Sequence, residues 1–219
     1  MSPTRRNVLL VDLDGTLTDP AEGIIGSFRD ALEAMGCAAP PAADLGWIIG
    51  PPLRPTFAKF LGGRQEAEAA LGHYRARYGE SGLFEAVVYD GIPDALAALE
   101  RAGARLMLCT AKPIVYARRI LDRFDLARFF DAAYGDELGG RFENKGDLIA
   151  HILAEHGLAP DRCAMLGDRE HDVLAAAENG VPAIGALWGY GGEAELTAAG
   201  AAVLCARPAD VPAAFAGLP

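Results

Sequence analysis

The chain has 219 residues, of which 51% are apolar and 23% are charged, and its formal net charge is −10. This length fits one large domain, or a core domain with a smaller insert, and the apolar share excludes a largely disordered chain. The excess of acidic residues, with no run of Lys or Arg, argues against a nucleic-acid or anionic membrane partner.

The first predicted element is a strand over Asn7–Asp12, rich in Val and Leu and without polar alternation. This pattern is typical of a parallel strand that is buried on both faces. Its apolar run, Val8–Val11, is too short for a signal peptide or a membrane helix. We therefore expect a cytoplasmic protein without a membrane partner, either a monomer or a homodimer.

A helical insert is predicted after this strand, because the stretch Pro20–Leu83 contains no convincing strand pattern. Gly and Pro residues separate its helical segments. Those segments are Ile24–Met35, Leu53–Leu61 and Arg64–Tyr78. We expect residues 19–83 to form a small helical domain, and residues 1–18 with 84–219 to form the core.

Strands and helices alternate in the rest of the chain. The predicted strands are Arg105–Cys109, Asp131–Tyr134, Cys163–Leu166, Pro182–Ala186 and Ala201–Leu204. The predicted helices are Ile92–Ala102, Ile114–Phe124, Lys145–His156 and Glu170–Asn179. This alternation predicts an α/β fold, a parallel sheet with helices on both faces.

Cysteine spacing gives no sign of a disulfide framework or a zinc site, since the chain has no C-x-x-C pair. Free thiols in a reducing compartment are expected. The four cysteines are Cys37, Cys109, Cys163 and Cys205.

Two carboxylates, Asp12 and Asp14, close the first strand and are followed by Gly15 and Thr16. Ligands of open α/β sheets bind at the carboxyl ends of the strands, where these side chains should lie. A lone Asp-Gly pair would more often be only a turn. Here, other strands also end in polar groups, which favours a functional site.

Thr110 follows the next strand of the core, and Lys145 begins a later helix. The Thr110 hydroxyl could bind a phosphate oxygen, or it could cap the helix that starts near Pro113, and a helix N-terminus is itself an anion site. Taken alone, a lysine at this position is more often a solvated surface residue, but its conflict with the helix dipole strengthens the case for an anion partner.

Asp168 and Asp172 follow a further buried strand at a spacing of i, i+4. Acids at this spacing repel each other, so they need a cation, unless they are simply favourable charges at a helix N-terminus. Together with Asp12 they suggest phosphoryl transfer to an aspartate. A negative nucleophile attacking a phosphate dianion needs a hard cation, and Mg²⁺ prefers oxygen ligands.

These residues resemble the four motifs of the haloacid dehalogenase superfamily. Asp12-Leu13-Asp14-Gly15-Thr16 is similar to the first motif, and Thr110 is similar to the second. Lys145 is similar to the third motif, and Gly167-Asp168 with Asp172 is similar to the fourth. The resemblance implies a Rossmann-like core whose inserted helical cap covers the site. Asp12 would be the nucleophile and Asp14 the general acid, then base. Asp12, Asp168 and the carbonyl of Asp14 would bind Mg²⁺, Asp172 would support the metal shell, and Thr110 and Lys145 would hold the phosphate.

The acid at position 14 favours phosphatases over the dehalogenases of this superfamily. The stretches Ile49–Arg54, Thr110–Pro113, Gly167–Asp172 and Leu187–Gly191 are similar to phosphoglycolate phosphatases and 5′-nucleotidases. Ala111 stands where Asn or Ser is common, which leaves fine specificity open. We count Ala111, Lys112 and Arg54 as further candidate substrate contacts. Arg54 could pair with a second anionic group of the substrate, or lie on the surface of a cap helix.

Two further features near these motifs have weaker interpretations. His171 is expected near the site or on the surface, without a chemical role, and the Gly-flanked Trp188 and Tyr190 are expected in a loop that lines the site or packs on the core. The predicted function is hydrolysis of a small soluble phosphate monoester. The alternatives are a phosphomutase on the same scaffold and a catalytically silent binding or regulatory protein.

Overall fold

The computed structural model describes residues 6–218, so residues 1–5 and Pro219 of the predicted core lie outside the described residues. The described chain divides into two compact units. One, here called the α/β unit, comprises residues 6–18 and 88–218, and the other, the helical unit, is Asp19–Val87.

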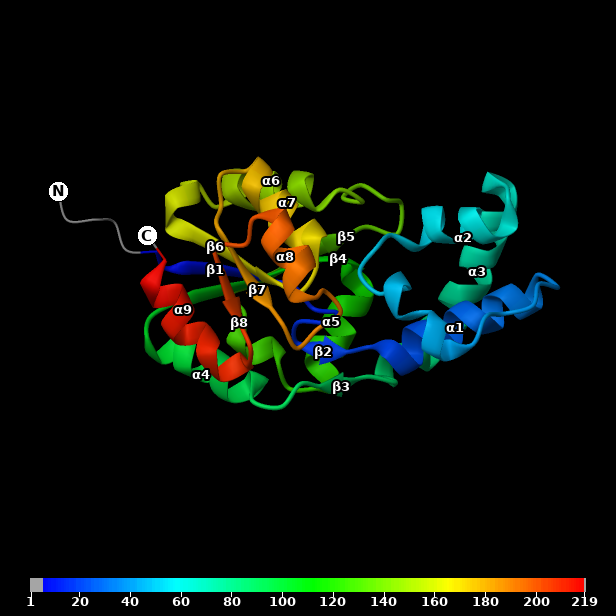
Figure 1. Cartoon of the computed structure of the whole chain (residues 1–219), viewed down its shortest axis with the longest axis horizontal. Coiled ribbons are helices and arrows are strands. Elements are labelled where there is room, and N and C mark those ends of the chain that lie inside the picture. The colour runs from blue at the N-terminus through cyan, green and yellow to red at the C-terminus, as the bar shows by residue number, and fades with distance from the viewer. Residues whose placement is uncertain (1–5, 219) are drawn as a thin grey trace. The chain divides into compact units, whose positions relative to one another are not determined.

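A six-stranded sheet forms the centre of the α/β unit, and every paired neighbour in it is parallel (Figure 1). Its strands, in spatial order, are β5 (Ala132–Asp136), β4 (Arg105–Pro113), β1 (Val8–Val11), β6 (Cys163–Gly167), β7 (Ala183–Ala186) and β8 (Val203–Cys205). Strand β1 is central and completely buried, as its unbroken apolar sequence predicts. The predicted parallel α/β class is confirmed.

Helices cover both faces of this sheet (Figure 1). They are α4 (Ile92–Arg101), α5 (Ile114–Arg123), α6 (Lys145–Glu155), α7 (Glu170–Glu178), α8 (Glu193–Ala199) and α9 (Val211–Gly217). Apolar residues of α6 and α7 pack with Val8, Met107 and Met165 on one face, and α4 and α9 lie on the other. The sequence did not predict α8 and α9, because helices of seven residues show little periodicity.

Strand β4 continues to Pro113, beyond the predicted end at Cys109. Its register with β5 shifts between Thr110 and Pro113. The continuation is possible because Gly135 of β5 has no side chain: a Cβ there would clash with the carbonyl oxygen of Lys112. Thr110 therefore belongs to a strand and does not cap the following helix, which begins at Ile114.

The helical unit contains α1 (Ala21–Ala34), α2 (Leu53–Leu61) and α3 (Arg64–Glu80), close to the predicted bounds. An aromatic cluster fills its centre. The rings of Phe28 and Phe57 stack with centroids 4.5 Å apart, and those of Tyr74 and Tyr78 stack at 5.2 Å. This burial of large rings accounts for the packing of three helices without a sheet.

The helical unit extends to Val87, past the predicted end of the insert at Leu83. The reason is an ion pair: the Arg77 Nη1 of α3 lies 2.9 Å from Glu85 Oε2 and so ties the segment after Leu83 to the helices. The chain passes between the units through β2 (Thr18–Asp19) and β3 (Val87–Val88), which form a two-stranded sheet. Strands of two residues carry no sequence pattern that would predict them.

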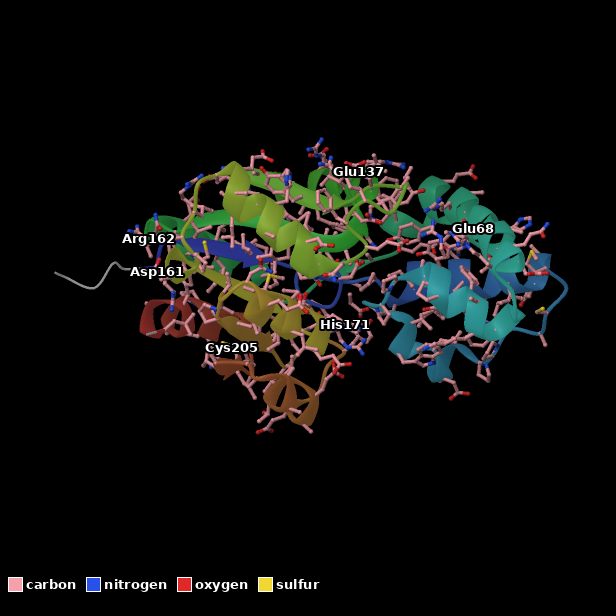
Figure 2. The ribbon with its side chains drawn as sticks, turned by 90° about the horizontal axis from the view of Figure 1, so that it is seen from above. Glu68, Glu137, Asp161, Arg162, His171 and Cys205 are labelled. Carbon is pink, nitrogen blue, oxygen red and sulfur yellow. The ribbon has the colours of Figure 1, made fainter. Side chains whose placement is uncertain are left out.

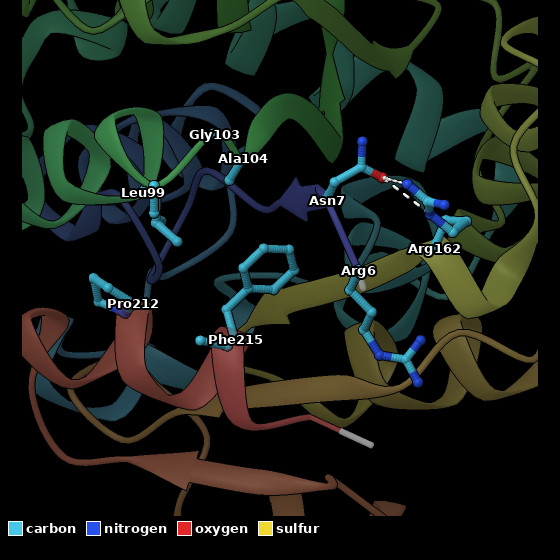
Figure 3. Close-up of a pocket in the computed structure, with 10 residues that line it drawn as sticks. Arg6, Asn7, Leu99, Gly103, Ala104, Arg162, Pro212 and Phe215 are labelled. Carbon is cyan, nitrogen blue, oxygen red and sulfur yellow. Dashed lines mark hydrogen bonds between the residues drawn. The ribbon is translucent and has the colours of Figure 1, made fainter. Parts of the chain in front are cut away.

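A cavity of about 210 Å³ lies at the amino-terminal edge of the large sheet (Figure 3). Asn7 and Arg162, which precede β1 and β6, line it together with Leu99 of α4 and Phe215 of α9. Asp12 and Asp168 follow the carboxyl ends of the same strands, so the cavity lies at the opposite edge of the sheet from the predicted site.

All four cysteines are free thiols, and three of them are buried. Burial raises the pKa of Cys109 to about 12, so this thiol stays protonated and unreactive. Over residues 6–218, no helix combines the length and the apolar character that crossing a bilayer requires.

Candidate active site

The first part of the site is a tight turn at the end of β1. The Asp12 N–H donates to the Leu166 carbonyl at 2.9 Å, which extends the pairing of β1 with β6 by one residue. The backbone then reverses at Gly15, whose φ of +84° is a conformation that glycine adopts without strain. The turn holds both predicted acids in the interior, since Asp12 is 5% exposed and Asp14 is 9% exposed.

Lys145 is buried and contacts two of the predicted acids. Its Nζ lies 2.9 Å from Asp12 Oδ1, and it also forms an ion pair with Asp172. The Asn144 side chain caps α6 by accepting from the Gly146 N–H at 2.7 Å. Burial lowers the pKa of Lys145, but Asp12 and Asp172 outweigh this and raise it, so the amine stays charged. The alternative of a solvated surface lysine is therefore wrong.

Three buried carboxylates, those of Asp12, Asp168 and Asp172, each offer an oxygen within 4.8 Å of the others. Burial, together with the charges of Asp172 and Asp12, raises the pKa of Asp168 to about 8, and burial also raises that of Asp172. Lys145 supplies a single positive charge against three potential negative ones. The donor set and the charge imbalance fit a hard divalent cation with oxygen ligands.

The Asp14 carboxylate is not one of these three acids and pairs instead with Lys112. Lys112 Nζ donates to Asp14 Oδ2 at 2.5 Å, and Lys112 is only 8% exposed. Burial raises the pKa of Asp14, although Lys112 opposes this effect. The other oxygen, Oδ1, is buried and accepts no hydrogen bond from any residue that the structure describes. Burial therefore favours the protonated form of Asp14. Its Oδ1 atom has no hydrogen-bond partner among the described residues.

The end of β4 brings further candidates to the same edge of the sheet, because β4 is the neighbour of β1. Thr110 is buried, and its Oγ1 accepts from the Lys112 N–H at 3.2 Å. Ala111, between them, is partly exposed. Three adjacent strands, β4, β1 and β6, therefore carry predicted site residues at their carboxyl ends. These residues are Thr110, Asp12 and Asp168.

Two residues considered in the sequence have other surroundings. Arg54, on α2 of the helical unit, forms an ion pair with Glu68 of α3, and Glu68 is labelled in Figure 2. His171 is exposed at the start of α7 (Figure 2), which is the surface position that was one of its two expected places.

The contacts that hold Asp168 could not be predicted from its sequence neighbours. The Thr16 hydroxyl donates to Asp168 Oδ1 at 3.1 Å, and the Tyr190 N–H donates to Oδ2 at 2.8 Å. Residue 16 precedes Asp168 by 152 positions. The only signal in the sequence was the run of glycines around Trp188 and Tyr190, which indicated a loop but not its partner.

Replacing Gly15 by Ala is expected to lower activity by about 100-fold or more, the scale of loss for a displacement of about 1 Å in an active site. A Cβ there would clash with the Asp168 carboxylate, in addition to straining a positive φ. Gly103→Ala is the matched control, since Gly103 has a φ of +81° and open space around it. It should lose about 1 kcal/mol of stability and keep its activity. Equal activity in the two variants would contradict a role for this close approach.

Known proteins are similar to this chain in sequence and in fold. A model of the haloacid dehalogenase-like hydrolase family matches residues 9–186. A protein of Pseudomonas aeruginosa named 5′-nucleotidase is 48% identical over 192 residues, which cover 87% of this chain and 86% of that one. The structure of a predicted phosphatase from Clostridium acetobutylicum superposes with a TM-score of 0.94 at 36% identity, covering 98% of this chain and 100% of that one.

A third relative is named as a kinase and not as a phosphatase or a nucleotidase. The tyrosine-protein kinase PtkA of Mycobacterium tuberculosis is 41% identical over 184 residues, which cover 84% of this chain. The match spans 63% of that protein's own length.

Proposed function

The chain belongs to the haloacid dehalogenase-like hydrolase family and is a phosphoric monoester hydrolase, and we propose that it hydrolyses a small soluble phosphate monoester through a phosphorylated Asp12, with Mg²⁺ as cofactor. The observation that carries this proposal is the buried cluster of Asp12, Asp168 and Asp172 with Lys145. Asp12 follows β1 and Asp168 follows β6, while Asp172 lies in the first turn of α7 and Lys145 begins α6.

In the first step, a carboxylate oxygen of Asp12 attacks phosphorus and the bond from phosphorus to the leaving oxygen breaks. Asp14 gives its proton to that oxygen, so the product leaves as an alcohol. The raised pKa of Asp14 favours the protonated form that this step needs. Lys145 offsets the negative charge on Asp12 and on the phosphate oxygens, and the Thr110 hydroxyl binds one of those oxygens.

In the second step, water attacks the aspartyl phosphate. Asp14, now a carboxylate, takes the proton from that water, and inorganic phosphate leaves while the Asp12 carboxylate is restored. Asp12, Asp168 and the backbone carbonyl of Asp14 would hold Mg²⁺, with Asp172 supporting them. When bound, this ion would supply positive charge that offsets the negative charges of the nucleophile and the phosphate.

For the substrate, we propose a phosphoglycolate-like compound or a nucleoside 5′-monophosphate. The relative named 5′-nucleotidase supports the second class, and relatives named phosphoglycolate phosphatase, such as that of Agrobacterium fabrum at 33% identity, support the first. We assign the helical unit the role of a cap over the site. Arg54 and Lys112 remain candidate substrate contacts, and Arg54→Ala should raise KM if its guanidinium leaves Glu68 for the substrate.

Phosphate release from a panel of metabolites, with Mg²⁺ and with a chelator, tests the proposal. The panel holds phosphoglycolate, nucleoside 5′-monophosphates, sugar phosphates, phosphotyrosine and an aryl phosphate. Magnesium-dependent release from one metabolite at kcat/KM above about 10⁴ M⁻¹s⁻¹ would identify the substrate class. Phosphate transfer to a second hydroxyl without release would instead indicate a mutase or a kinase, the latter being the activity for which the Mycobacterium tuberculosis relative is named.

Replacing Asp14 by Asn should separate the two steps. With an alkyl phosphate, kcat should fall by about 10²–10⁴-fold, because the leaving oxygen receives no proton. An aryl phosphate has a better leaving group, so the variant should release a burst of aryl alcohol equal to the enzyme concentration and then turn over slowly. Rapid-quench measurement of both products checks this. Equal losses for both substrates, with no burst, would contradict the role of Asp14 as general acid.

A further inference from the structure

The loop between β7 and α8, residues 187–192, contacts the site at two points. The Trp188 indole N–H donates to the Thr16 carbonyl at 3.0 Å. The Tyr190 backbone N–H donates to Asp168 Oδ2 at 2.8 Å. One short loop therefore touches both the turn that follows β1 and the acid that follows β6.

Glycines let the loop come this close. A Cβ at Gly189 would clash with the Gly15 carbonyl and with the Asp168 side chain, and a Cβ at Gly191 would clash with the Asp168 carbonyl. The far end of the loop is anchored through α8: Glu195 Oε1 accepts from Arg169 Nε at 2.8 Å. The backbone of the loop is thus packed directly against Asp168.

These contacts close a ring of hydrogen bonds around the Asp168 carboxylate. Trp188 holds the Thr16 carbonyl, the Thr16 hydroxyl donates to Oδ1 of Asp168 at 3.1 Å, and Tyr190 donates to Oδ2. With a donor on each oxygen, the carboxylate cannot turn without breaking a hydrogen bond. Hydrogen-bond partners of this kind orient a carboxylate that binds a cation, and their loss typically costs about 10–100-fold in affinity.

We propose that Trp188 is a positioning residue that fixes Asp168, through Thr16, in the orientation that binds the divalent cation. This inference rests on the proposed function, because it assumes that Asp168 is a cation ligand. Trp188 touches neither the substrate nor the reacting atoms in this assignment. The proposed role depends on the hydrogen bond that its indole N–H donates to Thr16, and not on the volume of its ring.

Trp188→Phe tests the assignment, since it keeps an aromatic ring and removes the N–H. Calorimetric titration of the full chain with Mg²⁺ alone should show binding about 10-fold weaker than in the wild type. Raising the Mg²⁺ concentration should restore the lost turnover, with little change in substrate KM. Trp47→Phe is the matched control: Trp47 is 43% exposed in the helical unit, and its replacement should leave the Mg²⁺ affinity unchanged.

Two outcomes would overturn the inference, and they differ in meaning. If Trp188→Phe binds Mg²⁺ as tightly as the wild type, Trp188 has only a packing role and the proposed function stands. If the wild type itself binds no Mg²⁺, the proposed function fails and this inference with it. A purely structural role would lower the melting temperature in chelator without changing the Mg²⁺ affinity of the folded protein.

A second measurement needs no variant at position 188 and covers the case in which Trp188→Phe fails to fold. In Trp47→Phe, the one remaining indole N–H is that of Trp188, so its NMR resonance is identified directly. That proton should exchange slowly with solvent, and its resonance should shift on Mg²⁺ addition with the midpoint found by calorimetry. Exchange at the rate of a free indole, or no shift, would overturn the assignment.

Discussion

Asp12→Asn is expected to lower phosphate release by about 10⁴-fold or more, because the amide oxygen is a poor nucleophile and no acyl phosphate forms. The fold should survive, since Asn has nearly the same size and the change removes one charge from a cluster in which burial already disfavours charge. Inorganic phosphate should bind at least as well as in the wild type, because the variant carries less negative charge at the site. Phosphate release and mass spectrometry of acid-quenched enzyme provide the two readouts.

The control for this prediction is Asp122→Asn, on the exposed side of α5. It should keep full activity, and peptides from its quenched reaction should carry phosphate on Asp12, as in the wild type. Retained turnover in Asp12→Asn, or a phosphate found on another residue, would show that the reaction does not pass through Asp12. Loss of folding in Asp12→Asn would appear in its melting temperature and is separable from loss of chemistry.

Lys145→Met should cause a large loss of both stability and activity. The lysine is buried and pairs with Asp12 and Asp172. Without it, three carboxylates would face one another in the interior with no counter-charge. Removing one partner of a buried ion pair typically costs about 3–5 kcal/mol, because a charge is left uncompensated. Urea unfolding in the presence of a chelator measures this loss.

A second substitution identifies the cause of that loss. Adding Asp172→Asn to Lys145→Met removes one of the uncompensated carboxylates, so the double variant should regain part of the stability. If the loss came only from packing, the second change would instead add to it. Lys59→Met, at an exposed lysine of α2, is the control and should change stability by only about 0.5 kcal/mol. Mg²⁺ at 100 times its Kd should return about 2.7 kcal/mol to Lys145→Met if the ion binds the folded state alone.

The amino-acid sequence by itself determined the fold class and the edge of the sheet on which the site lies. An unbroken apolar run such as Val8–Val11 is stable only when both faces of the strand are covered, which requires a parallel sheet between helices. Since every such strand points the same way, the polar residues at the carboxyl ends of β1, β4 and β6 must collect at one edge. Asp12, Thr110 and Asp168 could therefore be assigned to one site without coordinates.

The pairing of these side chains was decided only by the tertiary structure. Lys112 follows Asp14 by 98 residues, and Lys145 precedes Asp172 by 27. Contacts at such separations depend on the spatial order of the strands and on side-chain rotamers, which local patterns do not encode. Lys112, predicted as a candidate substrate contact, pairs with Asp14. Lys145, which taken alone suggested a surface position, forms ion pairs with two buried acids. Burial is the physical reason, since it makes an uncompensated charge too costly and so selects partners that the sequence does not reveal.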